Sequence, residues 1–251
     1  MNRKKKYQHG FSEKYYDEMY DFEARKLKAK KIKSVIEDYF SGNVSELSLL
    51  DVGCSNGYMT KIFSENVGRA VGTDIDDKAL NYAKENFASD KLSFKKDDSM
   101  NMGFEDNSFD IVTCNQVYEH VPDSKILMKE IYRVLKPGGI CYFACSNRLR
   151  VIEDHYQLPF LSIIPKFLAH LYLRILGKGK YYYENHLTVW GLRKLVKKFD
   201  IKDYTKKIIR DPEKYFAIDM VKPNTGKQKI ALYLLRFVYW FFPAYVWVLK
   251  K

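Results

Sequence analysis

Short apolar runs alternate with helical stretches between residues 47 and 145, and this alternation limits the possible folds more than any other feature. Five of the runs have the length and composition of buried strands: 47–52, 69–74, 92–95, 109–114 and 140–145. Apolar strands joined by helices form a parallel sheet whose two faces are both covered. The sequence therefore predicts a doubly wound α/β fold, and the chain is long enough for one such domain with an elaboration.

Ligands of such sheets bind beyond the carboxyl ends of the strands, so the turns that follow the strands are the segments to inspect. The first turn contains Gly53 and Gly57 and leads into a helix. Glycines let the backbone approach a ligand closely, and a helix N-terminus offers N–H groups to an anion. A dinucleotide fingerprint would need glycine at positions 55 and 58, where the chain has Ser55 and Tyr58, so NAD binding is disfavoured.

Five segments resemble, in order, the motifs of class I S-adenosylmethionine-dependent methyltransferases, and in particular of members with a methyltransferase domain 11-like sequence. The segments are 49–57 (LLDVGCSNG), 71–76 (VGTDID), 97–110 (with DDSM and GFEDNSFD), 115–121 (NQVYEHV) and 135–139 (LKPGG). Five motifs in the family's order form a specific signal. The resemblance implies a Rossmann-like, mostly parallel seven-stranded sheet with a helical, aromatic-rich C-terminal elaboration, and S-adenosyl-L-methionine as the cofactor.

The resemblance also implies ten cofactor-binding residues at the ends of the first four strands. They are Asp51, Gly53, Cys54, Gly57, Asp74, Ile75, Asp98, Ser99, Met100 and Asn115. Gly53 and Gly57 would shape the turn around the methionine part of the cofactor, and Asp51 would help to hold that turn and the amino group. Ser55 stands where the family usually has a third glycine. Because serine is small, we expect binding to survive.

The later motifs imply contacts with the nucleoside. Asp74 would accept hydrogen bonds from the ribose hydroxyls, and a carboxylate is well suited to this. Asp98 would face the adenine amino group, with the backbone of Ser99 and Met100 beside the ring. Asn115 would lie under the sulfonium. A strand-end cap or a solvated turn residue is the alternative for each acid taken alone.

Methyl transfer requires alignment of the acceptor with the methyl group, and an oxygen acceptor usually also needs a base. The candidate catalytic residues are His155, His120 and Glu153. A structural histidine beneath the cofactor is the alternative for His120. For His155 the alternatives are an exposed histidine or a weak metal site with Glu153, and His186 is a further candidate. No resident metal is expected, since the four cysteines form no zinc-like pairing with histidines.

These patterns divide the chain into four parts. They are an N-terminal helical lid region (1–45), a cofactor-binding α/β core (46–147), a substrate-side insertion with the last strands (148–226) and an aromatic, apolar C-terminal helix (227–251). The lid region is predicted to contain one long helix over 13–40. Its Tyr15-Tyr16 pair resembles the aromatic lid of related enzymes, with ordinary helix-packing tyrosines as the alternative.

Positive charge is concentrated in the C-terminal part of the chain. The net charge is +12, and residues 148–251 hold 21 lysines and arginines against 8 acids. This asymmetry indicates an anionic partner: membrane phospholipid, a phosphorylated substrate or nucleic acid, the last disfavoured because no RNA-reading module is evident. Solvated lysine-rich faces are the alternative. No apolar run follows the basic residues 1–6, so a signal peptide is not expected.

One segment predicts contact with a membrane surface. Lys166, His170 and Arg174 recur every four residues within 164–177, and the residues between them are mostly apolar. Such an amphipathic basic helix is suited to a bilayer interface. A helix packed over the active site is the alternative.

A second segment, 230–249, has the length of a membrane-spanning helix but is interrupted by Arg236 and Pro243. It is rich in tyrosine and tryptophan, which favour the headgroup zone. We expect interfacial anchoring here, with a core or dimer helix and a true span as the alternatives.

Residues 148–199 also resemble a subgroup of these methyltransferases found with enzymes of cell-surface polysaccharide and lipid-linked glycan synthesis, through EDHYQLPF at 153–160 and Ile164-Pro165. The sequence therefore predicts a cytoplasmic methyltransferase, peripheral to the cell membrane, that methylates an oxygen or carbon of a small amphiphilic or lipid-linked acceptor. Methylation of RNA or protein, and a cofactor-binding scaffold without catalysis, are the alternatives. No sequence feature indicates an oligomeric state.

Overall fold

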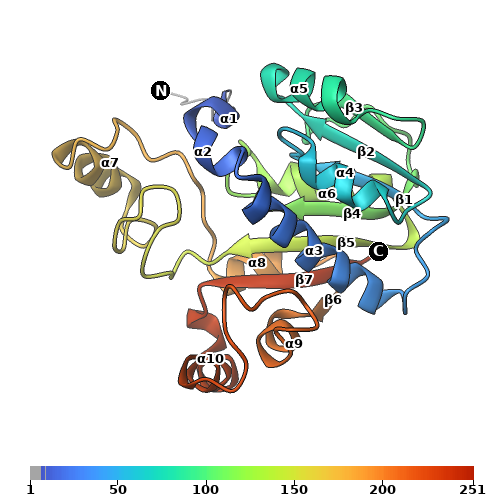
Figure 1. The fold of residues 1–251 in the computed structure, drawn as a ribbon. Helices are drawn as coiled ribbons and strands as arrows, with labels where there is room; N and C mark the ends of the chain where they lie inside the picture. The colour runs from blue at the N-terminus through green and yellow to red at the C-terminus, as the bar shows by residue number, and fades with distance from the viewer. Residues whose placement is uncertain (1–6, 9) are drawn as a thin grey trace.

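The computed structural model describes residues 7–8 and 10–251, and within them the strands form a single seven-stranded sheet (Figure 1). The strand order is β3-β2-β1-β4-β5-β7-β6, with β7 antiparallel to both of its neighbours and the other pairs parallel. The strands are β1 (Ser48–Val52), β2 (Arg69–Asp74), β3 (Leu92–Lys96), β4 (Phe109–Asn115), β5 (Leu135–Ser146), β6 (Asp200–Asp203) and β7 (Ala244–Lys250). The predicted fold class is confirmed. The charged N-terminus 1–6 lies outside the described residues.

Helices cover both faces of this sheet. All the helices of the described residues, including those that lie off the faces, are α1 (Phe11–Lys14), α2 (Tyr16–Met19), α3 (Phe22–Tyr39), α4 (Tyr58–Ser64), α5 (Asp77–Phe87), α6 (Ser124–Val134), α7 (Lys166–Ile175), α8 (Val189–Leu195), α9 (Thr205–Arg210) and α10 (Gly226–Phe237). Residues of α3, α4, α5 and α9 share one buried cluster with Leu49, whereas α6 and α8 share the other with Leu50. Successive strand residues point to opposite faces, so a strand buried on both sides is apolar throughout.

Carboxylates at helix N-termini explain where several helices begin. Asp21 accepts a hydrogen bond from Ala24 N at the start of α3, and Asp123 accepts one from Lys125 N at the start of α6. Asp76 caps α5 in the same way. Each carboxylate satisfies an N–H group that has no partner within its helix. The cap at Asp21 also corrects the prediction of one helix over 13–40, because the chain forms the short α1 and α2 first and starts α3 anew at this cap.

The predicted C-terminal helix over 227–251 is wrong. The chain forms α10, then a 3-10 turn at Tyr239–Phe241, and enters the sheet as β7 after Pro243, which has no N–H group to continue a helix. Tyr245 and Trp247 are fully buried in the core, so they are not available to a headgroup zone. No helix among the described residues is both long enough and apolar enough to cross a membrane.

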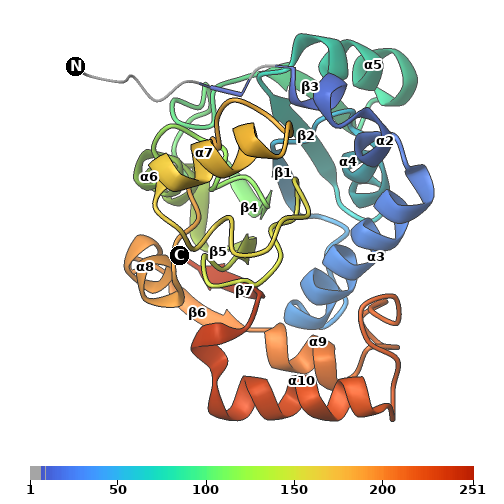
Figure 2. The ribbon, with the colours of Figure 1, turned by 90° about the vertical axis from the view of Figure 1, so that its left-hand side faces the viewer.

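The amphipathic helix predicted within 164–177 is present as α7. Ala169 and Leu173 pack into a small separate core with residues of the segments 156–161 and 182. Figure 2 shows α7 lying across the carboxyl-end side of the sheet, apart from the helices that cover its faces. The opposite side of α7 leaves Phe167 and Ile175 exposed, at 70% and 72% of their accessible surface. The helix therefore presents an apolar face without a partner among the described residues.

Candidate functional site

A cavity opens at the carboxyl ends of β1, β2 and β4, beneath the N-terminal helices. Its walls come from residues 7–28, from the turns after these strands, and from the loop that follows β5. Its empty volume is about 1070 Å³, including the part that opens to solvent.

The turn after β1 has the backbone that a close ligand requires. Gly53 and Gly57 have φ angles of 73° and 74°, in the left-handed region that favours glycine. A Cβ atom on Gly53 would lie 2.8 Å from Val117 Cγ2, so a side chain does not fit there. Ser55, in the place of the family's third glycine, also adopts a left-handed φ of 51°. Its hydroxyl is buried and has no hydrogen-bond partner.

Asp74 joins this turn to the end of β2. Its carboxylate accepts hydrogen bonds from Ser55 N at 2.7 Å, Ile75 N at 2.7 Å and Asp76 N at 3.0 Å. Burial raises the pKa of Asp74, and these N–H groups oppose the rise. Asp74 lines the cavity. Since each carboxylate oxygen can accept two hydrogen bonds, Oδ2 keeps acceptor capacity for a hydroxyl group.

Asp51 lies behind the turn. Its buried carboxylate accepts hydrogen bonds from Thr60 Oγ1 at 2.6 Å and from Thr113 Oγ1 at 2.5 Å, which ties β1 to α4 and β4. Burial raises the pKa of Asp51 to about 6. The structure gives it a bracing role, and among the described residues it is not one that lines the cavity.

Half of the ten predicted cofactor residues line the cavity and half stand behind its wall. Those that line it are Gly53, Asp74, Ile75, Ser99 and Asn115. Asp98 is not among the lining residues; its carboxylate accepts hydrogen bonds from Met100 N at 2.9 Å and from the hydroxyl of Tyr7, which does line the cavity. Its neighbours Asp97 and Ser99 reach the cavity instead. Like Asp51, the residues Cys54, Gly57 and Met100 are not part of the described cavity lining.

Two cations of α3 line the cavity and were not predicted. Arg25 is 6% exposed; its Nη1 lies 3.4 Å from Met19 Sδ, and its Nε has no hydrogen-bond partner. Burial lowers the pKa of Arg25, and Asp51 is foremost among the carboxylates that oppose the fall. Burial likewise lowers the pKa of Lys28. Helical spacing could have identified Arg25, because it shares the buried face of α3 with Ala29 and Ile32.

The candidate catalytic histidines meet at the mouth of the cavity. The rings of His120 and His155 pack edge to face with 5.0 Å between centroids, and Phe11 contacts both rings. Gln8 Oε1 lies 3.2 Å from His120 Nδ1. Burial, followed by the neighbouring histidines, lowers the pKa of His120 well below its usual value, so this imidazole is neutral at physiological pH. Both histidines line the cavity.

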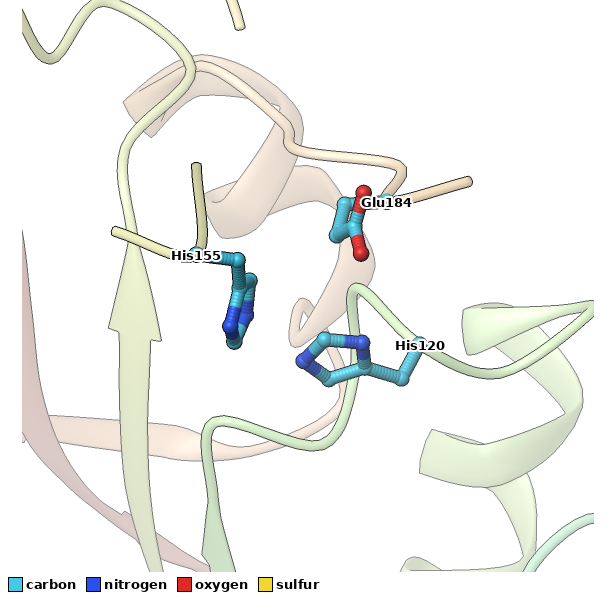
Figure 3. A group of neighbouring side chains, drawn as sticks. All are labelled: His120, His155 and Glu184. Atoms are coloured by element: carbon cyan, nitrogen blue, oxygen red, sulfur yellow. The ribbon is translucent and has the colours of Figure 1, made fainter. Parts of the chain in front are cut away.

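Glu153 does not accompany them. It is fully buried, accepts a hydrogen bond from Tyr156 N at 2.8 Å and lies 3.8 Å from His186 Nε2. Among the described residues it is not part of the cavity lining. The carboxylate that approaches the histidine pair is that of Glu184, in the segment before α8 (Figure 3). No motif in the sequence indicated this residue. One potential ligand atom from each of His120, His155 and Glu184 lies within 4.8 Å of the other two.

A comparison with protein families matches residues 50–143 to a family model described as a methyltransferase domain. A demethylmenaquinone methyltransferase of Lactococcus lactis subsp. lactis (strain IL1403) is 33% identical over 143 residues, which are 54% of this chain and 56% of the relative. One of Staphylococcus aureus (strain MRSA252) is 35% identical over 144 residues, covering 55% of this chain and 58% of the relative. The chain thus spans little more than half the length of these relatives.

Solved structures with the same fold align over most of the chain. An S-adenosylmethionine-dependent methyltransferase from Mesorhizobium loti aligns with a TM-score of 0.55 and 17% identity, covering 83% of this chain and 93% of that one. The [4+2]-cyclase SpnF aligns with a TM-score of 0.53 and 16% identity, covering 87% and 80%. At these identities the likeness shows the fold alone, which is shared by proteins with different reactions.

Proposed function

We propose that this chain, whose residues 50–143 form a class I S-adenosylmethionine-dependent methyltransferase domain, transfers a methyl group to a small amphiphilic acceptor at a membrane surface. One observation carries the proposal: a single cavity joins the cofactor turn at Gly53 and Asp74 to the imidazoles of His120 and His155. In the reaction, an oxygen or carbon of the acceptor forms a bond to the methyl carbon as the carbon–sulfur bond breaks. The sulfonium becomes a neutral thioether, and the acceptor gives up one proton.

The chain's own residues match the two polar ends of the cofactor. Asp74, held by three backbone N–H groups, has an oxygen available for the ribose hydroxyls. Arg25 is a buried cation in the cavity wall, and its Nε has no partner. A buried guanidinium is stabilised by a carboxylate, and we assign Arg25 to the carboxylate of the methionine part.

The acceptor would enter on the side of the imidazole pair. Phe11 from the N-terminal region packs on both imidazoles, so α1 helps to enclose this side of the cavity. Holding the acceptor atom in line with the methyl group and sulfur is the main task of such a site, and alignment alone supplies up to about 7–11 kcal/mol. In this arrangement the imidazoles stand beside the acceptor atom and polarise it.

Two observations support an amphiphilic acceptor. The relatives from Lactococcus lactis and Staphylococcus aureus are named for demethylmenaquinone, which favours a lipid-like quinone. A second cavity adjoins α7, and basic side chains outnumber the acids Asp123 and Glu184 in its lining: Lys125, Lys129, Arg148, Lys166, Lys194, Lys197 and Lys198. This basic groove, next to the exposed apolar face of α7, suits an acceptor or a surface that combines negative charge with an apolar part.

The acceptor class is tested by methyl transfer from labelled S-adenosylmethionine into a cell extract that is then separated into lipid, RNA and protein fractions. We expect label in the lipid fraction with the wild-type protein and much less with Asp74→Asn, because that variant lacks the carboxylate that would bind the ribose hydroxyls. Label in RNA or protein would replace the proposed acceptor class. Cofactor binding without label in any fraction would indicate a scaffold.

Membrane contact is tested by sedimentation with phosphatidylcholine vesicles that either contain or lack phosphatidylglycerol. We expect binding to the anionic vesicles, and its loss when the exposed apolar residues Phe167, Leu171 and Ile175 of α7 are changed to serine. Each of these side chains would contribute roughly 1.5–3 kcal/mol when buried. Ile126→Ser, at an exposed apolar residue of α6, is the matched control and should still bind. Equal sedimentation of all three proteins would contradict the proposal.

A further inference from the structure

Buried polar atoms without hydrogen-bond partners gather beside the histidine pair. Among the described residues near this pair, such atoms are Glu119 Oε2, His155 Nδ1, Tyr182 Oη, Glu184 Oε1 and His186 Nδ1. Glu153 Oε1 and His186 Nε2 also lack a hydrogen bond, but they lie 3.8 Å from each other. Buried polar groups are nearly always satisfied by protein, water or an ion, because an unpartnered group is costly. This concentration therefore indicates a bound species among these residues.

Three members of this region converge as metal ligands do. His120 comes from the loop after β4, His155 from the loop after β5 and Glu184 from the segment before α8, and their side chains point toward one another (Figure 3). Their potential ligand atoms all lie within 4.8 Å of one another. Ligands of one zinc ion at bonds of about 2.1 Å and tetrahedral angles lie about 3.4 Å apart. Small side-chain rotations toward a common centre thus complete the geometry.

The surroundings of these ligands support the same conclusion. Glu184 is 1% exposed, and its Oε1 is unpartnered while Oε2 accepts a hydrogen bond from Tyr183 N. Gln8 Oε1 lies 3.2 Å from His120 Nδ1, as expected if this histidine donates its second ring N–H to an oxygen and binds a metal through Nε2. Two imidazoles with one carboxylate form a ligand set that suits zinc and other divalent transition metals.

We infer that His120, His155 and Glu184 bind one divalent transition-metal ion, such as zinc, at the edge of the cofactor cavity. This site departs from the expectation of no resident metal, because its three ligands come from three separate loops and share no local sequence motif. Three protein ligands leave a coordination position open. His120 and His155 both line the cavity, so an oxygen of the acceptor can take that position.

The role of the ion rests on the proposed function, whereas its binding does not. A metal-bound hydroxyl loses its proton more readily because the ion stabilises the resulting anion. The acceptor oxygen would thus be held and ionised in place, and its proton would pass to solvent. The methyl group is then transferred as described above, with no change in the oxidation state of the metal.

The inference is tested on tag-free, chelator-treated protein titrated with Co²⁺, followed by visible absorption, and with Zn²⁺, followed by calorimetry. We expect one ion per chain, and at least about tenfold weaker binding by His155→Ala and Glu184→Gln. His170→Gln on α7 is the matched control, because it removes a histidine outside the cluster while the new amide oxygen can still accept the hydrogen bond from Tyr182 N, and it should bind as the wild type does. Circular dichroism of each variant confirms that it is folded.

Absence of metal binding by the wild-type protein would overturn the inference, and so would unchanged binding by both folded ligand variants. Methyl transfer at full rate by metal-free protein would leave the proposed function intact and show that the imidazoles act without a metal. Metal binding without methyl transfer to any fraction would establish the site and overturn the proposed function instead. The two proposals therefore fail separately.

Discussion

The imidazole ring of His155 packs edge to face against that of His120, with 5.0 Å between the ring centroids. The two residues follow neighbouring strands, β4 and β5, whose parallel pairing brings both loops to the same edge of the sheet. The same edge carries the cofactor turn after β1. Strand pairing alone thus places the imidazoles at the same edge of the sheet as the turn at Gly53, where the proposed methyl transfer would take place.

Asp74→Asn is expected to weaken cofactor binding on the order of 10–100-fold, because hydrogen bonds to a charged group are each worth about 1.5–3 kcal/mol. Calorimetric titration with S-adenosylhomocysteine measures the change. The matched control is Asp77→Asn, which removes an exposed carboxylate that pairs with Lys96 at the surface and should leave affinity unchanged. Equal losses in both variants would show that the effect is a general one of charge.

Arg25→Met should weaken binding of S-adenosylmethionine at least about tenfold, because a charge-assisted hydrogen bond to the methionine carboxylate is lost. Binding of 5′-methylthioadenosine, which lacks that carboxylate, should change little. Lys26→Met, at the exposed neighbouring residue, serves as the control. If the two ligands lose affinity equally in Arg25→Met, the guanidinium supports the cavity wall and does not bind the carboxylate.

The buried carboxyl group of Asp51 should make stability fall with rising pH. Its pKa in the folded protein is about 6, against an ordinary value of 3.8. The folded state therefore binds more protons between these values, and the contribution is fully present below about pH 4 and lost as pH rises through about 6. Denaturant unfolding at several pH values, compared with Asp51→Asn, should show the wild type losing up to about 3 kcal/mol relative to the variant. A difference that stays constant with pH would refute this assignment.

Ser55→Gly should stabilise the protein by about 0.5–1 kcal/mol. A left-handed conformation costs a non-glycine residue roughly 1–2 kcal/mol, and the greater freedom of glycine in the unfolded chain offsets part of the gain. Ser55 has a φ of 51°, and its buried hydroxyl lacks a partner. The free energy of unfolding measures the effect, with Ser34→Gly in the interior of α3 as a control of opposite sign. Destabilisation by Ser55→Gly would mean that the hydroxyl makes a contact of its own.

The cofactor half of the site could be predicted because it is local in sequence. Gly53, Asp74 and Asn115 each end a strand within the alternating pattern, and a parallel sheet brings such ends together. Arg25 and Glu184 join the site from elements that the motifs do not include. Which face of a basic helix turns inward, and which loop folds back over the sheet, depend on tertiary packing.

In the C-terminal segment a local pattern was present, but it predicted the wrong kind of element. Residues 230–249 form an apolar stretch of helical length, yet α10 ends at Phe237 and β7 begins at Ala244. Periodicity does not distinguish a buried strand from a buried helix in a short apolar run. Trp247 is buried because β7 lies between β5 and β6 in the sheet. The residues around it in the sequence do not indicate this position.

The proposed function depends most on the identity of the molecule that the cavity binds. Calorimetry of the purified protein with S-adenosylmethionine, S-adenosylhomocysteine and NAD tests it directly. We expect the first two to bind at one site per chain, and NAD to give no heat, because the turn at Gly53 and Asp74 suits a sulfonium nucleoside. Clear binding of NAD, with no heat from either sulfur nucleoside, would contradict the account.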